Sequence, residues 1–311
     1  MKPLPRALRV LLPLGVSCAL FALLARQIDF GAALRTITPR ALLLLAPALL
    51  AYVALSLWLE AISLVRVLRG VGGRLDTATA ARIKAASYTF GLVHYALGAA
   101  ALVVLLRRKG LLPMAEATGI VMLITAFDAL ALLGITALGS AFFTNHALAL
   151  RAGLVGALLA AAPIGLIALR TEYSLGPLDR LRDLRLLRSV REMPSARLVE
   201  LLALRTLFVL VFIGLGGAAL AAFDVWPPLG DLIVGFTVLT LVSLLPIAVA
   251  GLGTGQVAFV YLFRHSANAE TLLAASLALS AGTILLRVAL AALFAREFAR
   301  EALAGTQEAQ S

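Results

Sequence analysis

The hydrophobic positions of the chain fall into eight long apolar runs, and most charged residues lie in the short segments between them. A helix needs about 20 consecutive apolar residues to cross the hydrocarbon core of a bilayer, and several runs reach this length. The pattern therefore predicts an all-α polytopic membrane protein, with residues 1–311 forming a single integral membrane domain. The apolar runs are 8–25, 41–65, 85–106, 111–139, 148–169, 198–222, 229–264 and 270–295.

The segments between the runs predict the orientation of the chain. Clusters of Lys and Arg follow the second, third and fifth runs, at 66–84, 107–109 and 170–197. If 85–106 crossed the membrane once, the last two clusters would lie outside, against the tendency of basic loops to stay in the cytoplasm. We therefore predict that 85–106 is a re-entrant hairpin that enters and leaves from the cytoplasmic side. Both termini then lie in the cytoplasm.

The run 229–264 is interrupted by residues that break helices. Pro246 removes a backbone donor, and Gly251, Gly253 and Gly255 permit backbone conformations that other residues avoid. We predict a second re-entrant hairpin, which enters and leaves from the outer side. Non-helical backbone at that depth must be buried in protein or line a wet cavity.

The predicted layout has about six full spans and two re-entrant helical hairpins. The triplets within 41–139 and 198–297 run in opposite senses, so the layout forms an inverted repeat. Inverted repeats with broken helices are typical of transporters, whose binding sites lie at the interface between the repeats. The pattern therefore favours a transporter with its site between these two segments.

The composition narrows the class of protein further. The chain is 62% hydrophobic, whereas soluble domains are about 45–50% apolar. Its net charge of +11 would suggest nucleic acid for a soluble protein, but here the basic residues set membrane orientation, so no nucleic-acid partner is expected. With one cysteine, Cys18, and three histidines, we expect no metal site and no other cofactor.

The ionisable residues within the predicted spans include Glu60, Asp128, Arg205 and Arg287. A charge near the bilayer centre costs at least about 2.5–3.5 kcal/mol and therefore usually faces a cavity or a partner. We expect Glu60 to pair with Arg205 or Arg287 toward the cytoplasmic side. Asp128 is expected nearer the outer side, without a basic partner, as either a structural or a functional acid.

Other polar residues in the runs allow two interpretations. Tyr52, Ser56 and Ser63 share a helical face with Glu60, and hydrogen bonding between helices is the alternative to a functional role for such a stripe. His94 and Tyr95 lie near the tip of the first predicted hairpin. A single histidine there is either a packed hydrogen-bonding group or a proton relay.

The stretch PIAVAGLGTGQVAFVYLF, which begins at Pro246, resembles the signature of flippase-like proteins that share the membrane region of lysylphosphatidylglycerol synthases. The family pattern resembles P-I-S-x-G-G-L-G-x-x-E, and Gln256 stands where an acid is common. The first hairpin keeps Gly98 and a basic exit but lacks the proline and the acid of many members. The positions that match the pattern are Pro246, Ile247, Gly251, Leu252 and Gly253.

The resemblance implies movement of a polar lipid, anionic or phosphate-bearing, or of a lipid-linked intermediate, between the leaflets of a bacterial cytoplasmic membrane. Membrane lipids are then the expected partners. The backbone amides of Gly253 to Gln256 begin a half-helix whose positive end favours an anion such as a lipid phosphate. The expected substrate-binding residues are Gly251, Gly253, Thr254, Gly255, Gln256, Arg287, Arg205, Glu60, Asp128, His94 and Tyr95.

Two other functions stay open at this point. The protein is alternatively an accessory membrane protein that binds a lipid- or glycan-assembly enzyme and moves nothing. An intramembrane enzyme ranks last, because no nucleophile–base pair or metal-ligand spacing is visible, and GLGTG lacks the Lys–Ser/Thr of a phosphate-binding loop. We therefore expect no enzymatic activity, and a homodimer stays open as the assembly.

Overall fold

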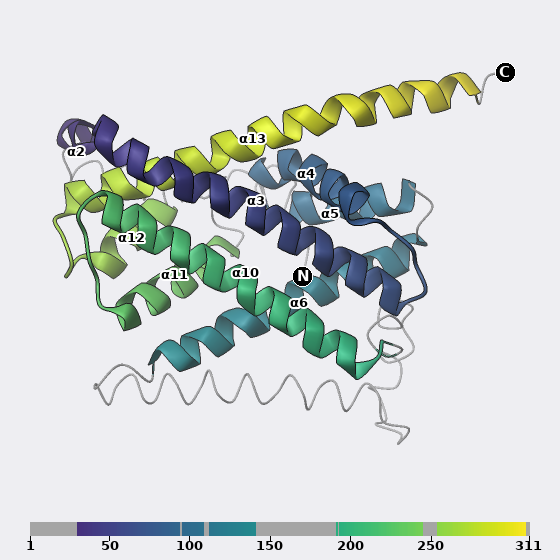
Figure 1. Cartoon of the computed structure of the whole chain (residues 1–311), viewed down its shortest axis with the longest axis horizontal. Helices are drawn as coiled ribbons and strands as arrows, with labels where there is room; N and C mark the ends of the chain where they lie inside the picture. The colour runs from purple at the N-terminus through teal and green to yellow at the C-terminus, as the bar shows by residue number, and fades with distance from the viewer. Residues whose placement is uncertain are drawn as a thin grey trace, which may run out of the picture.

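The structure is a computed structural model that describes residues 30–93, 95–108, 112–140, 191, 193–244 and 254–308. Within these residues every regular element is an α-helix, which confirms the predicted class (Figure 1). The helices are α2 (Phe30–Thr36), α3 (Pro39–Gly70), α4 (Thr77–Val93), α5 (Tyr95–Arg108), α6 (Met114–Ser140), α10 (Ser195–Ala222), α11 (Leu229–Leu244), α12 (Thr254–Phe263) and α13 (Ala269–Glu308).

Among the described residues, four helices are long and apolar enough to cross a membrane: α3, α6, α10 and α13. They correspond to four of the six full spans that the sequence predicts. The other two predicted spans, 8–25 and 148–169, lie outside the described residues. With its 32 residues, α3 reaches roughly 48 Å at 1.5 Å per residue, well beyond the apolar thickness of a bilayer.

Polar side chains mark where several helices begin. The Thr38 hydroxyl accepts a hydrogen bond from the Ala41 N–H at the start of α3, and Asn268 caps α13 in the same way. At α4, the Asp76 carboxylate accepts a 2.8 Å bond from the Thr79 N–H, and this bond lowers the pKa of Asp76. Each cap satisfies an N–H that has no partner inside its helix.

Two runs that the sequence predicts to be interrupted each form a pair of short helices. In the first run α4 ends at Val93, α5 begins at Tyr95, and the two helices pack on each other; in the second run α11 packs on α12. That each pair enters and leaves the membrane on one side stays a prediction. The first pair is longer than predicted, because Asp76 caps its first helix and α4 therefore begins at Thr77 rather than near residue 85.

The crossing of α4 and α5 depends on two glycines. A Cβ added to Gly98 would lie 2.8 Å from the Cα of Gly91 and 3.5 Å from the carbonyl oxygen of Ser87. The two backbones are therefore in direct contact, as in other membrane helices that cross at small residues.

The helices α3, α4, α5 and α6 form a first group, and α10, α11, α12 and α13 form a second group. The contacts of the first group are repeated by the second. Helix α3 packs on α4 as α10 packs on α11, and α5 packs on α6 as α12 packs on α13. Helix α6 of the first group contacts α11, and its counterpart α13 contacts α4. In the same way α3 contacts α13, and its counterpart α10 contacts α6. At the centre α3 and α10 pack extensively on each other. Each helix of the first group therefore has a counterpart in the second with corresponding neighbours.

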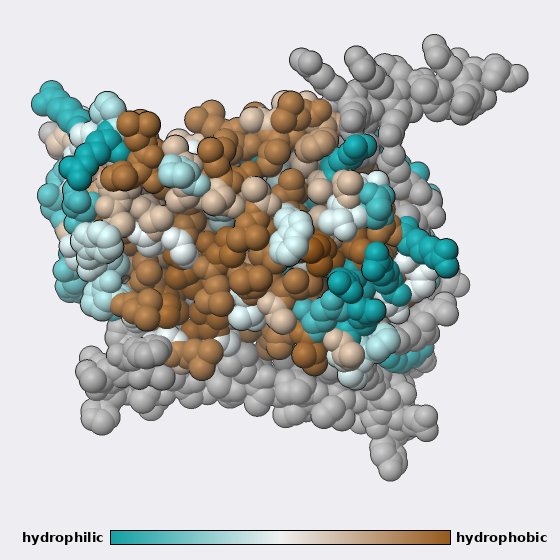
Figure 2. Space-filling view, in the orientation of Figure 1, coloured by the Kyte–Doolittle hydropathy of each residue, from teal (hydrophilic) through white to brown (hydrophobic). Residues whose placement is uncertain are grey.

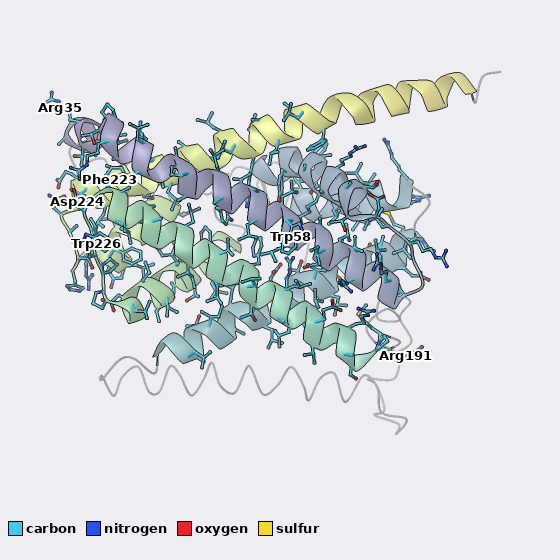
Figure 3. All side chains as sticks on the ribbon, in the orientation of Figure 1. Arg35, Trp58, Arg191, Phe223, Asp224 and Trp226 are labelled. Atoms are coloured by element: carbon cyan, nitrogen blue, oxygen red, sulfur yellow. The ribbon has the colours of Figure 1, made fainter. Side chains whose placement is uncertain are left out.

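The surface is divided into an apolar middle and two polar ends. Hydrophobic side chains cover the middle of the face shown in Figure 2, and hydrophilic ones gather toward both ends. Figure 3 places Arg191 at one end and Phe223, Asp224 and Trp226 at the other. We call these the basic end and the far end. Trp58 lies between them, half exposed on the apolar middle of α3.

Ion pairs join helix ends at the basic end. Arg66 near the end of α3 lies with its Nε 3.1 Å from Oε1 of Glu200 in the first turns of α10. Arg197 reaches the other oxygen of the same carboxylate at 2.6 Å. The pair α4–α5 lies toward this end, whereas α11–α12 lies toward the far end (Figure 1).

Gly98→Ala is expected to destabilise the protein, because its new Cβ meets the backbone of Gly91 and not a movable side chain. Overpacking of this kind costs about 1–3 kcal/mol. Thermal unfolding in detergent measures the loss. Gly214→Ala is the matched control, since nothing lies within 4 Å of its added Cβ. Equal unfolding temperatures for the two variants would show that the α4–α5 crossing is not tightly constrained.

Candidate functional site

A cavity of about 300 Å³ lies between helices from both groups. Its walls come from α3, α4, α5, α6 and α10, with single residues from α11 and α13. Apolar side chains line much of it, but an unusual number of polar groups face it as well. The polar and charged lining residues are Tyr52, Glu60, Lys84, Ser87, Tyr88, Thr125, Asp128, Thr240 and Arg287.

Glu60 is held by two residues of α4. Lys84 Nζ lies 3.0 Å from its Oε1, and the Tyr88 hydroxyl donates a hydrogen bond to its Oε2. Lys84 and Tyr88 are four residues apart, so they share one face of α4. Both carboxylate oxygens of Glu60 are therefore engaged, and the contact joins the first helix pair to α3.

Arg205 is the buried cation of the site, with only 2% of its side chain exposed. Its Nη1 lies 3.2 Å from Oδ1 of Asp128, and its Nη2 donates to the hydroxyl of Ser63 at 2.8 Å and to the carbonyl oxygen of Leu59 at 3.5 Å. The guanidinium carbon lies 5.1 Å from the ring centre of Phe208. Arg205 thus connects α10 to α3 and α6.

Both pairings differ from the sequence-based expectation. Glu60 pairs with Lys84 and not with Arg205 or Arg287, because α4 begins early and carries Lys84 into the helix bundle. Asp128 has a basic partner, Arg205, although none was expected. Helices α6 and α10 both start at the basic end, and Asp128 and Arg205 lie roughly 21 and 15 Å along them, a difference that the long arginine side chain spans.

Arg287 differs from the other charged residues of the cavity. Its Nη2 donates a hydrogen bond of 3.2 Å to the Tyr52 hydroxyl, and its guanidinium carbon lies 5.9 Å from the ring centre of Tyr52 and 5.1 Å from that of Tyr88. Such contacts with aromatic faces stabilise a cation. No carboxylate of the described residues forms an ion pair with Arg287.

The charges of the described residues around the cavity do not balance. Lys84 forms an ion pair with Glu60 and Arg205 with Asp128, so among the described residues Arg287 has no ion-pair partner of its own. A surplus charge in surroundings of low dielectric constant attracts an ion of the opposite sign more strongly than it would in water. The cavity is therefore suited to a small anionic group.

Other residues of the predicted site lie elsewhere. Helix α12 is described from Thr254 onward, and the predicted start of a half-helix between Gly253 and Gln256 stays a prediction. Thr254, Gly255 and Gln256 do not line the cavity. Gln256 is fully buried, and its Nε2 lies 3.4 Å from the hydroxyl oxygen of Ser280, so it joins α12 to α13.

Four predicted site residues are not placed by the structure. His94, Gly251 and Gly253 lie outside the described residues. Tyr95 is the first residue of α5, but its side chain is also outside the description. Their predicted contribution to the site stays a prediction.

The sequence reading missed Lys84 and Tyr88, which the structure places beside Glu60. Lys84 was assigned to a cytoplasmic basic cluster, and Tyr88 was treated as part of an apolar run. Their i, i+4 spacing was the available signal, since it matches the spacing of Tyr52, Ser56 and Glu60 on α3.

The fold and the site define a multi-pass α-helical membrane protein with a charged cavity among its helices. The family model described as the lysylphosphatidylglycerol synthase TM region matches residues 10–291, so the chain belongs to this family. The match confirms the resemblance that the Pro246 stretch indicated. No curated protein matches the sequence at a significant level.

Arg205→Leu is expected to lower the free energy of unfolding by about 3–5 kcal/mol, because it leaves the carboxylate of Asp128 unpaired. The double variant Arg205→Leu, Asp128→Leu should lose less than the sum of the two single variants. Thermal unfolding in detergent measures the losses of the two single variants and the double variant, which together form a double-mutant cycle. Arg66→Gln is the control, since its exposed pair contributes only about 0–1 kcal/mol. Additive losses at Arg205 and Asp128 would contradict the coupling.

Proposed function

We propose that the protein is a flippase-like transporter, which moves a polar lipid with an anionic or phosphate-bearing head group, or a lipid-linked intermediate, between the membrane leaflets. The observation that carries the proposal is Arg287, a cation without an acidic partner among the described residues, on the wall of a cavity between membrane helices. A lipid phosphate can supply the negative charge with which Arg287 would pair.

Neighbouring groups can complete the contact with a phosphate. The Tyr52 hydroxyl accepts a hydrogen bond from Arg287 and keeps its own proton to donate to a second oxygen. The hydroxyl of Ser87, by contrast, donates to the carbonyl oxygen of Lys84 at 2.7 Å, so Tyr52 supplies the hydroxyl donor beside Arg287. A guanidinium and a nearby hydroxyl suit the several oxygens of a phosphate, since charge-assisted hydrogen bonds are stronger than neutral ones.

The helix arrangement supports an inverted repeat with two re-entrant hairpins. The helices of the two pairs contain 17, 14, 16 and 10 residues. At 1.5 Å per residue the described part of each helix reaches about 15–26 Å, less than the ~30 Å hydrocarbon core. The pairs lie toward opposite ends of the molecule, and corresponding helices have corresponding neighbours.

This arrangement suggests how a head group crosses. The cavity lies where the two groups of helices meet, as binding sites do in transporters built from inverted repeats. Its polar wall replaces water around the head group, while the acyl chains stay in the lipid beside the apolar surface. We further propose that the basic end faces the cytoplasm of a bacterial cell, because basic loops favour that side.

A cysteine placed at the end of α5 tests the first hairpin. Cys18→Ser removes the native cysteine, and Arg108→Cys adds an exposed one. An impermeant thiol reagent should label it from the cytoplasmic side only, because α5 returns to the side from which α4 enters. Asp224→Cys at the far end is the control and should react only from outside. Labelling of Arg108→Cys from outside would mean that 77–108 crosses the membrane.

Arg287→Gln should reduce transport of anionic lipids about 10-fold or more, because a hydrogen bond to a charged group contributes about 1.5–3 kcal/mol. The measurement uses vesicles containing the purified protein and labelled phosphatidylglycerol, a prenyl phosphate or phosphatidylcholine. Arg287→Lys should retain part of the activity, since it keeps the charge but loses the planar donor geometry.

Arg264→Gln is the control, because this exposed arginine packs on Tyr261 outside the cavity. Unaltered transport by Arg287→Gln would remove this residue from the binding site. If the unmodified protein moves none of the three lipids, the transport proposal fails. Capture of a lipid- or glycan-assembly enzyme would then favour the accessory role.

A further inference from the structure

Four phenylalanine rings contact one another in a continuous cluster beside the cavity. Phe212 of α10 contacts Phe236 of α11, with ring centres 5.7 Å apart. Phe236 contacts Phe259 and Phe263 of α12 at 5.7 and 5.4 Å, and these two rings lie 5.0 Å from each other. We call these four residues the aromatic cluster. Ring centres at such distances give favourable aromatic contacts.

The aromatic cluster begins at the cavity and extends toward the far end. Phe212 lines the cavity, and its ring centre lies 5.8 Å from that of Tyr52 on the same wall. Phe236, Phe259 and Phe263 are almost fully buried. Phe263 is the last residue of α12 and is followed by the exposed Arg264. The cluster therefore occupies the interior between the cavity and the far end.

Two glycines hold the rings tightly. A Cβ on Gly216 of α10 would overlap the ring of Phe236, and one on Gly235 of α11 would lie 2.5 Å from Cζ of Phe263. Each ring thus rests directly on the backbone of a neighbouring helix. A packed apolar interior of this kind leaves no room for water or for a polar group.

The corresponding position in the first group of helices has the opposite character. There the pair α4–α5 presents Lys84, Ser87 and Tyr88 to the cavity. The pair α11–α12 has corresponding neighbours but contributes three phenylalanines to the cluster and, among its described residues, only Thr240 to the cavity wall. The first pair therefore presents charged and polar side chains to the cavity, whereas the second pair places phenylalanine rings beside it.

We infer that the aromatic cluster is the barrier that closes the cavity toward the far end, with Phe236 as its central residue. The role of this barrier in transport rests on the proposed function, but the barrier itself does not. A head group that leaves toward the far end must displace Phe236 from Gly216, which requires α11 to move away from α10. Access from the far end to the cavity is the property to measure.

A single cysteine in the cavity measures this access without any lipid. The parent protein carries Cys18→Ser and Thr240→Cys, which places the thiol on the cavity wall one helical turn from Phe236. An impermeant thiol reagent is applied to the far-end side of oriented membranes. Asp224→Cys, exposed at the far end, shows that the reagent reaches this side.

The parent should react at least 10-fold more slowly than Asp224→Cys, and adding Phe236→Ala should accelerate labelling at least 10-fold. Phe90→Ala is the matched control, since this half-exposed ring lies on α4, outside the aromatic cluster. Fast labelling of the parent from the far-end side would overturn the inference. So would slow labelling of the Phe236→Ala protein when its unfolding temperature shows that it is folded.

Phe263→Leu is the second variant, in case Phe236→Ala does not fold. It keeps the position apolar but removes the ring that rests on Gly235, and it should accelerate labelling to a smaller extent. Lipid movement is followed separately in vesicles that contain the unmodified protein. If the labelling pattern is as expected but no lipid moves, the barrier stands and the proposed function fails. If lipid moves while the parent is freely labelled, the function stands and the barrier fails.

Discussion

The arrangement of the long helices depends on how one positive charge is kept in the apolar interior. Arg205 is almost fully buried, and an ionised group in such surroundings is tolerated only with partners for its charge and its N–H groups. Asp128 supplies the charge, and Ser63 and Leu59 accept further hydrogen bonds. Because these partners come from α6 and α3, the depths of three helices in the membrane are fixed relative to one another.

This constraint also determines the chemistry of the cavity. Asp128 lines the cavity, but its charge is already compensated by Arg205 behind it, and Glu60 is likewise engaged by Lys84. Among the described residues neither carboxylate forms an ion pair with Arg287, although the charge of Glu60 still interacts with it. Arg287 has no ion-pair partner among the described residues because Asp128 pairs with Arg205 and Glu60 with Lys84, and not because one helix carries an excess of basic residues.

Much of the fold could be predicted from the sequence, since it depends on local patterns. Long apolar runs indicated α3, α6, α10 and α13, and the glycine-rich segment beginning at Pro246 indicated the interruption before α12. The pairings of Glu60 and Asp128 could not be predicted, because they depend on which helices pack together and at what depth. The contacts of the aromatic cluster could not be predicted either. The sequence does not distinguish an apolar residue that faces lipid from one that packs on a neighbouring helix.

The unequal interiors of the two helix pairs have an energetic consequence. If the proposed inverted repeats were identical, the forms open to either side would be related by a two-fold rotation and would have equal free energy. Here one opening would separate phenylalanine rings from Gly216 and Gly235, whereas the other involves side chains that already tolerate water. The two forms would therefore be populated unequally, and the unliganded molecule would rest closed toward the far end until a ligand compensates the difference.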